Sequence, residues 1–215
     1  MKYAKYIFRS LFYYRRRYFG VFLGVTVSTG VLVGSLLTGD SVRYSLRHLA
    51  LSRLGKTEVA VTTGDRFCRA ELADEISSET HPAVPLLRCS GICVRRGGEL
   101  RVNNVQVFGV EDRFWKMAQS PVSHKPLKDG EVMLNSRLAS RLELKTGDSL
   151  LLRVEKSGSV PLDMPFVSAD KLSQALTVKV AKIITAEEFG NFSLEISQVA
   201  PLNLFMPLSV LSTKL

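Results

Sequence analysis

The longest apolar run in the chain extends from Tyr18 to Gly39 and contains no charged residue. As an α-helix these ~22 residues would span ~33 Å, about the thickness of the hydrocarbon core of a bilayer. We therefore predict a transmembrane helix over residues 18–39. It separates a short N-terminal arm, residues 1–17, from a much longer C-terminal part.

The pattern of residues 2–17 predicts an amphipathic helix at the membrane surface. On a helical wheel Lys2, Lys5, Arg9 and Arg16 fall within about 60°, and apolar residues lie opposite them. Tyrosine and phenylalanine are concentrated in the same stretch, as is typical of helices at the headgroup level. We expect the four basic residues to contact the inner leaflet; the alternative is a disordered basic arm.

A retained anchor fits the span better than a cleaved signal peptide does. No alanine occurs between Ala4 and Ala50, and the apolar run exceeds the roughly 7–15 residues of a signal peptide. The arm has basic residues and no acidic one, so the positive-inside rule places the N-terminus in the cytoplasm. We expect the inner membrane of a bacterium as the location, with the main domain on the periplasmic side.

Four glycines give the predicted span one face of small residues. Gly20, Gly24, Gly30 and Gly34 form two GxxxG spacings and fall within about 120° on a helical wheel. Small residues let a second helix approach closely in lipid, where close packing drives association. No second apolar run of this length follows. We expect the partner helix to belong to another chain, such as a second copy, or to a missing part of this protein.

Helical spacing continues from Asp40 to Leu54, and Gly55 is a plausible helix stop. We therefore predict a stalk helix over residues 40–56. Residues 50–57 resemble a relaxed phosphate-binding loop, but such a loop follows a strand and opens a helix. Here a helix precedes and a β-prone stretch follows, so we interpret the match as chance.

The pattern of residues 57–215 predicts a mixed α+β domain. The periodicity does not reveal the order of the strands in its sheet. Gly97-Gly98 indicates a hairpin, and residues 157–170 indicate an exposed loop. We predict strands over Glu58–Thr62, Val84–Arg95, Leu100–Val110, Gly130–Leu134, Ser149–Val154, Leu176–Ile184, Phe192–Ile196 and Leu204–Met206. We predict helices over Arg66–Glu79, Glu111–Ala118 and Ser136–Leu142.

Composition narrows the possible functions. The net charge is +9, but the arm supplies most of it, which argues against a nucleic-acid-binding domain. The chain has three cysteines, Cys68, Cys89 and Cys93. An odd number does not indicate a disulfide framework, and we interpret all three as buried. No catalytic motif or metal-spaced cluster is present, so we expect no enzyme activity, cofactor or metal.

Two stretches resemble a known family. Val107–Trp115 reads Val-Phe-Gly-Val-Glu-Asp-Arg-Phe-Trp, and Gly130–Arg153 contains Gly-Glu-Val, Leu-Ala and Gly-Asp at characteristic spacings. The order and spacing of these residues are similar to the periplasmic core domain of FtsX-like, MacB-type ABC transporter permeases. In that family the second stretch is a strand, a short helix and a Gly-Asp turn into the next strand. Leu138 and Leu142 would face inward from the helix.

The resemblance implies a protein without catalytic residues that transmits ATP-driven motion across the membrane. Such permeases have further membrane helices after the periplasmic domain and pair with a cytoplasmic ATPase. Because none follows here, we expect this chain to be the N-terminal part of a permease. The alternative is a single-pass, membrane-anchored periplasmic binding or sensor module. The sequence indicates no substrate.

Overall fold

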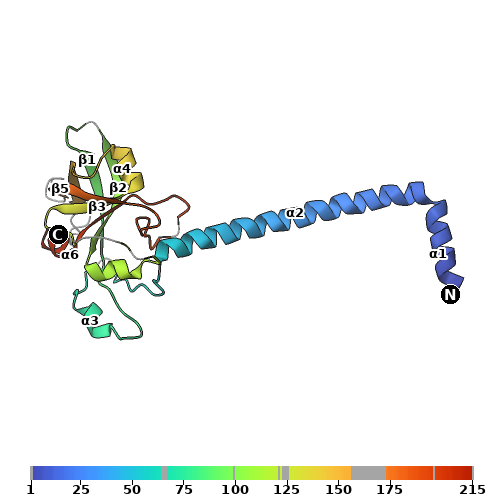
Figure 1. The fold of residues 1–215 in the computed structure, drawn as a ribbon, viewed down its shortest axis with the longest axis horizontal. Coiled ribbons are helices and arrows are strands. Elements are labelled where there is room, and N and C mark those ends of the chain that lie inside the picture. The colour runs from blue at the N-terminus through green and yellow to red at the C-terminus, as the bar shows by residue number, and fades with distance from the viewer. Residues whose placement is uncertain are drawn as a thin grey trace, which may run out of the picture. The chain divides into compact units, whose positions relative to one another are not determined.

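The computed structural model describes residues 2–63, 67–98, 100–120, 122, 126–155, 173–195 and 197–214. The chain forms two compact units, Met1–Leu49 and Ala50–Leu215, which are described separately. The helices and strands labelled in Figure 1 are α1 (Lys2–Tyr13), α2 (Arg15–Leu54), α3 (Leu72–Ile76), β1 (Leu87–Arg95), β2 (Arg101–Val110), the 3₁₀ helix η1 (Asp112–Met117), β3 (Glu131–Asn135), α4 (Ser136–Leu142), β4 (Ser149–Glu155), β5 (Ser173–Ile184), β6 (Asn203–Pro207) and α6 (Leu208–Lys214).

The N-terminal unit bends at Tyr14, between α1 and α2 (Figure 1). The Arg17 amide donates to the Tyr14 carbonyl at 2.9 Å, an i→i−3 bond that tightens the chain where the second helix begins. The single helix predicted over residues 2–17 is therefore wrong. Arg16 belongs to the second helix and does not share one helical wheel with Lys2, Lys5 and Arg9.

Helix α2 runs without interruption from Arg15 to Leu54. The predicted span and the helix predicted after it are thus one helix of 40 residues. Gly55 follows with a φ of +61°, the left-handed conformation that commonly ends a helix and that glycine adopts without a side-chain clash.

The C-terminal unit is built around a closed barrel with the strand order β1-β2-β6-β3-β5-β4. The pairs β2–β6 and β3–β5 are parallel, and the other four pairs are antiparallel. The predicted hairpin is present, with Gly97 and Gly98 both at positive φ in its turn. The combination of helices with this mixed sheet agrees with the α+β class; closure into a barrel was not predicted.

A β-bulge adjusts the register within that hairpin. Gly91 pairs with Val105 and Cys93 with Val102, so Asn103 and Asn104 together oppose one residue of β1. Asn104 adopts a φ of +56°, which asparagine tolerates better than most residues. The bulge brings Val102 and Val105, three positions apart, to the same buried side.

Two hydrophobic cores lie on opposite faces of the sheet. The first takes residues from all six strands, α4 and α6, including Val107 and Leu204. The second takes their neighbours Phe108 and Phe205, because successive residues of a strand point to opposite faces. Aromatic residues dominate this second core, named here the aromatic core: Phe108, Phe114, Trp115, Phe189, Phe192 and Phe205.

The segment Gly130–Arg153 folds as the resemblance implied. β3 leads into α4, which has the predicted bounds Ser136–Leu142, and Gly147 turns with a φ of +100° before β4. Asn135 caps α4 by accepting the amide of Leu138 at 3.0 Å. Leu138 and Leu142 are fully buried, as predicted.

Other local predictions are wrong. Glu58–Thr62 and the described residues of Phe192–Ile196 are not strands. The helix predicted over Arg66–Glu79 is confined to α3. Two of the apolar residues expected to form its buried face, Phe67 and Ile76, are exposed instead. The short helix α6 was not predicted. The loop expected over 157–170 lies outside the described residues.

Candidate functional site

Two threonine hydroxyls in the apolar part of α2 are bonded within the helix. In the described residues α2 is the one helix long and apolar enough to cross a membrane. Thr26 donates its hydroxyl to the carbonyl of Phe22 at 2.8 Å, and Thr38 donates to that of Gly34 at 2.9 Å. Each of these threonine hydroxyls therefore has an acceptor within the helix and needs none from the lipid.

The four glycines predicted as a packing face all lie in α2 and are exposed. A Cβ atom built on Gly20, Gly24, Gly30 or Gly34 meets no other atom within 4 Å. The absence of side chains leaves a flat strip along the helix where another backbone could approach. Nothing in the described residues occupies this strip.

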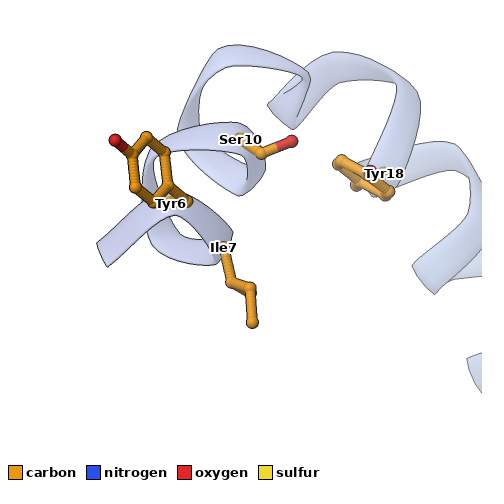
Figure 2. Close-up of a pocket in the computed structure, with 4 residues that line it drawn as sticks. All are labelled: Tyr6, Ile7, Ser10 and Tyr18. Atoms are coloured by element: carbon orange, nitrogen blue, oxygen red, sulfur yellow. The ribbon is translucent and has the colours of Figure 1, made fainter. Parts of the chain in front are cut away.

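The bend between α1 and α2 forms a shallow surface groove lined by Tyr6, Ile7, Ser10 and Tyr18 (Figure 2). Of the basic residues predicted to contact lipid, Arg9 lies in α1 and Arg16 in α2, and both are exposed. Lys2 and Lys5 lie in α1, but their side chains are outside the described residues. The groove combines hydroxyl groups with an apolar side chain, a surface typical of the membrane interface.

The C-terminal end of α2 packs tightly against the 3₁₀ helix η1. The amide of Lys56 donates to the carbonyl of Met117 at 2.7 Å. A Cβ atom on Gly55 would lie 2.4 Å from that same carbonyl oxygen and 2.7 Å from Cε2 of Phe189. Only glycine fits here without displacing backbone. We call the contacts of residues 53–56 with the domain the junction.

Phe189 occupies this place in a conformation unusual for its type. Its φ is +68°, and a bulky residue persists there only when its surroundings hold it. Its ring packs against Phe114 at 5.2 Å and Phe192 at 5.0 Å between centroids. The strained residue thus connects Gly55 to the aromatic core.

Arg53, in the last turn of α2, makes the second part of the junction. Its side chain is buried and donates from Nη1 to the carbonyl of Ser197 and from Nη2 to that of Gln198 at 3.5 Å. Hydrogen bonds from a charged donor are stronger than neutral ones. Arg53 therefore fixes the helix end to the segment we call the junction loop, residues 189–195 and 197–200.

Two buried asparagines hold the junction loop on the barrel. Asn203 donates from Nδ2 to the carbonyls of Gly190 at 3.0 Å and Phe192 at 2.7 Å. Asn135 donates from Nδ2 to the carbonyl of Pro201, the residue directly after the loop, at 2.8 Å. Both asparagines are fully buried, so losing either side chain would leave these carbonyls without this donor.

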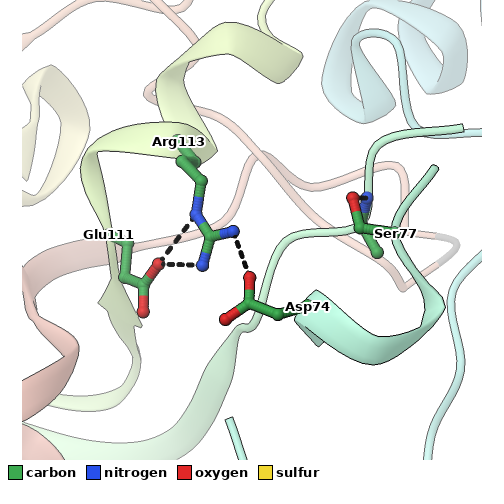
Figure 3. A network of polar contacts seen from close by, with 5 residues as sticks. Asp74, Ser77, Glu111 and Arg113 are labelled. Atoms are coloured by element: carbon green, nitrogen blue, oxygen red, sulfur yellow. Dashed lines mark hydrogen bonds and ion pairs between the residues drawn. The ribbon is translucent and has the colours of Figure 1, made fainter. Parts of the chain in front are cut away.

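A polar network connects η1 to α3 (Figure 3). Arg113 donates from Nη2 and Nε to Glu111 Oε2 at 2.7 and 3.1 Å, and from Nη1 to Asp74 Oδ1 at 2.5 Å. The bond to Asp74, followed by that to Glu111, raises the pKa of Arg113 above its ordinary value. These side chains are 35–61% exposed, so the network contributes little stability, although it ties α3 to the helix that carries the junction.

The stretch that resembles a phosphate-binding loop has the wrong structure for one. Residues 50–54 are the last turn of α2, and the C-terminal end of a helix carries a partial negative charge that repels phosphate. The amide of Lys56 is already bonded to Met117. Residues 53–56 of this stretch instead form the contacts of the junction.

In the described part of the chain no group of histidine, cysteine and acidic side chains could hold a metal ion. Cys89 and Cys93 are buried, and burial raises their thiol pKa values to about 11 and about 12. Cys68 is exposed, so the interpretation that all three are buried is wrong for this residue. Thiols with raised pKa values are poor nucleophiles.

The sequence indicated the glycine face and the helix stop at Gly55 but not the junction. Arg53 and Ser197 are 144 positions apart, and nothing in the local pattern distinguishes Arg53 from the exposed basic residues near it. Arg113 was part of the resemblance, but its ion pair with Asp74 depends on how α3 folds back.

Comparison with known proteins adds little. No protein-family model matches the chain, and no curated protein matches it. Among solved structures, the chain is similar to the periplasmic region of MacB from Actinobacillus actinomycetemcomitans, with 12% sequence identity and a TM-score of 0.43. The similarity covers 73% of this chain and 65% of that one. A likeness this weak carries no argument about function.

Proposed function

We propose that the chain is a permease component of an ABC transporter that transmits ATP-driven motion across the inner membrane for export or extraction of a substrate. The observation that carries the proposal is the junction. Among the described helices, α2 is the one apolar enough to cross a membrane, and Arg53 and Gly55 fix its C-terminal end to a folded domain. Under this proposal the attachment would pass a movement of the helix to the domain.

The proposed mechanism is mechanical. Helix α2 has 40 residues, which at ~1.5 Å each give a rod of ~60 Å. Residues 2–17 would rest on the inner leaflet, and the glycine face would pack against a neighbouring helix. A shift or rotation of α2 would then reach the junction without being absorbed by a flexible linker, because no break occurs between Arg15 and Leu54.

The two stretches of resemblance support this proposal by their position. Val107–Trp115 covers the end of β2 and most of η1, and η1 ends at Met117, whose carbonyl binds Lys56. Gly130–Arg153 covers β3, α4 and most of β4, next to the cap residue Asn135 that also holds Pro201. Both therefore contribute to the elements around the junction.

The proposed partners are a cytoplasmic ABC ATPase and further permease helices or a second copy of this chain. The proposed orientation places residues 1–17 in the cytoplasm and the domain in the periplasm. We propose no enzyme activity, cofactor, metal or nucleic acid for this chain.

Cys68 gives a direct test of orientation. It is the exposed cysteine of the chain, whereas Cys89 and Cys93 are buried. A membrane-impermeant maleimide added to intact spheroplasts should label the wild type and leave Cys68→Ser unlabelled. A matched variant, Cys68→Ser with Arg9→Cys, should react only after permeabilisation. The reverse pattern would invert the proposed topology.

The glycine face gives a test of the assembly. The chain should co-purify from membranes with an ABC ATPase, and Gly24→Leu with Gly30→Leu should reduce the recovery at least fivefold. Val25→Leu, on the opposite side of the helix, is the control and should behave as wild type. Recovery of the chain without any ATPase would favour the anchored binding or sensor module instead.

A further inference from the structure

The segment after the junction is exposed and unpaired. In the described part of the chain no hydrogen bond involves Glu58, Val59, Ala60, Val61 or Thr62. Val59 and Val61 are 79% and 77% exposed, more than most other apolar residues of the domain. The sequence nevertheless predicts a strand here, since the segment is rich in β-branched residues and has neither glycine nor proline.

The barrel does not pair with this segment. Each of its six strands has two neighbours in the closed order, so the barrel has no terminal strand, and no strand pair includes residues 58–62. The unpaired backbone groups of an extended segment can form main-chain hydrogen bonds with a strand of another molecule, as in β-augmentation.

The segment is complementary to a second copy of itself. In an antiparallel pair centred on Ala60, Val59 lies opposite Val61 of the other copy, and Ala60 lies opposite Ala60. Glu58 lies opposite Thr62, so no like charges face each other. Parallel pairing in register would place two Glu58 carboxylates side by side, which is unfavourable. Charge therefore favours the antiparallel arrangement, which has the two-fold symmetry of most homodimers.

The small size of the segment also favours a second copy over a soluble partner. A five-residue ribbon buries far less than the ~1,000 Å² that a stable interface between free proteins needs. Two chains held in one membrane by their α2 helices would have a high effective concentration, which lets a weak contact form. Only three residues, 55–57, lie between the end of α2 at Leu54 and the segment, so the segment cannot move far from the membrane anchor.

We propose that Glu58–Thr62 is a dimerisation strand that pairs antiparallel with the same segment of a second copy, centred on Ala60. The proposal rests on the membrane insertion proposed above and names the contact between two copies outside the bilayer. On pairing, Val59 and Val61 of both copies form one apolar patch on one face of the two-stranded ribbon.

Disulfide cross-linking of the full chain in membrane vesicles tests the register. In a Cys68→Ser background, Ala60→Cys places two thiols directly opposite each other at a Cα separation of about 4.5–5.5 Å, within disulfide range. Glu58→Cys is the matched control on the same face; its two copies would lie about 14 Å apart. The double variant Glu58→Cys with Thr62→Cys should cross-link again, because those positions face each other.

We expect mild oxidation to convert most of Ala60→Cys and of the double variant to a species of twice the chain mass, with at least tenfold less from Glu58→Cys. Equal cross-linking of Ala60→Cys and Glu58→Cys would overturn the register. A cross-link between Ala60→Cys and a different protein would overturn the choice of a second copy.

Gly24→Cys in the same background separates this proposal from the glycine face. Cross-linking at Gly24 without cross-linking at Ala60 would overturn the strand pairing and leave helix association in place. Cross-linking at Ala60 alone would support the strand pairing and argue against two copies meeting at Gly24. All substituted positions are exposed, so the variants should fold like the wild type.

Discussion

Replacing Gly55 by alanine should loosen the attachment of α2 to the domain and measurably destabilise it. Alanine at a φ of +61° costs about 1–2 kcal/mol because its Cβ approaches the following carbonyl. The same Cβ would lie 2.4 Å from the Met117 carbonyl oxygen, and relieving such overpacking costs about 1–3 kcal/mol. We therefore expect Gly55→Ala to lower the free energy of unfolding by about 2–5 kcal/mol.

Gly130→Ala separates these two costs. Gly130 has a φ of +84°, but a Cβ atom on it meets nothing within 4 Å. It should therefore lose only the backbone contribution, about 1–2 kcal/mol. For a unit of this size each kcal/mol lowers Tm by about 2–4 °C, so Gly55→Ala should melt well below Gly130→Ala.

The measurement is urea unfolding of residues 40–215, which contain the compact unit Ala50–Leu215, followed by tryptophan fluorescence. Trp115 is the sole tryptophan and lies in the aromatic core beside the junction. If Gly55→Ala and Gly130→Ala lose the same stability within about 0.5 kcal/mol, the close approach of Gly55 to Met117 is refuted, and with it the rigid junction.

Three further predictions concern the domain. In the native protein a maleimide should label Cys68 within minutes and leave Cys93 unlabelled, because burial raises the thiol pKa of Cys93 to about 12. Mass spectrometry counts the labelled sites, and rapid labelling of two sites would contradict this. Asn203→Ala should lower the free energy of unfolding by about 2–4 kcal/mol, because two buried loop carbonyls lose their donor; a loss below 1 kcal/mol in urea would contradict it. The hydrogen bond from Lys182 lowers the pKa of Glu188 below its ordinary value of 4.5, so its stabilisation is present above that value and is lost as pH falls through the lower, folded-state pKa. Glu188→Gln should thus cost about 0.5–1 kcal/mol at pH 7, and the difference from wild type should vanish in acid; a difference independent of pH would be inconsistent.

The parts of the fold that local chemistry specifies could be predicted from the sequence. The segment from β3 to β4 is one example, because Asn135 caps α4 and Gly147 turns the chain, and both act on residues a few positions away. The hairpin at Gly97-Gly98 and the helix stop at Gly55 are similar. A short helix such as α6 could have been found from the spacing of Leu208 and Leu211.

Contacts between segments far apart in sequence could not be predicted, and they determine the closed barrel and the junction. The strand containing Asn104 was predicted, but the bulge that shifts its register against β1 was not, and closure depends on parallel pairs between segments far apart in sequence. Phe192 was predicted to begin a strand; instead its ring packs against Phe108, with the ring centroids 5.5 Å apart, in the aromatic core. The glycine face could be read from spacing alone, but the junction depends on Arg53 reaching Ser197.

The position of the junction determines which part of the domain would respond first to a movement of α2. Gly55 and Lys56 contact η1 and Phe189, which belong to the aromatic core on one face of the sheet. The core on the other face, which all six strands share, has none of these contacts. The strands of the barrel are hydrogen-bonded to one another in a closed order, so we expect the movement to displace η1, the junction loop and, through Arg113, helix α3, while the barrel keeps its shape. A partner or substrate that senses the state of α2 should therefore bind over these outer elements, because binding at the barrel interior would leave it insensitive to the helix.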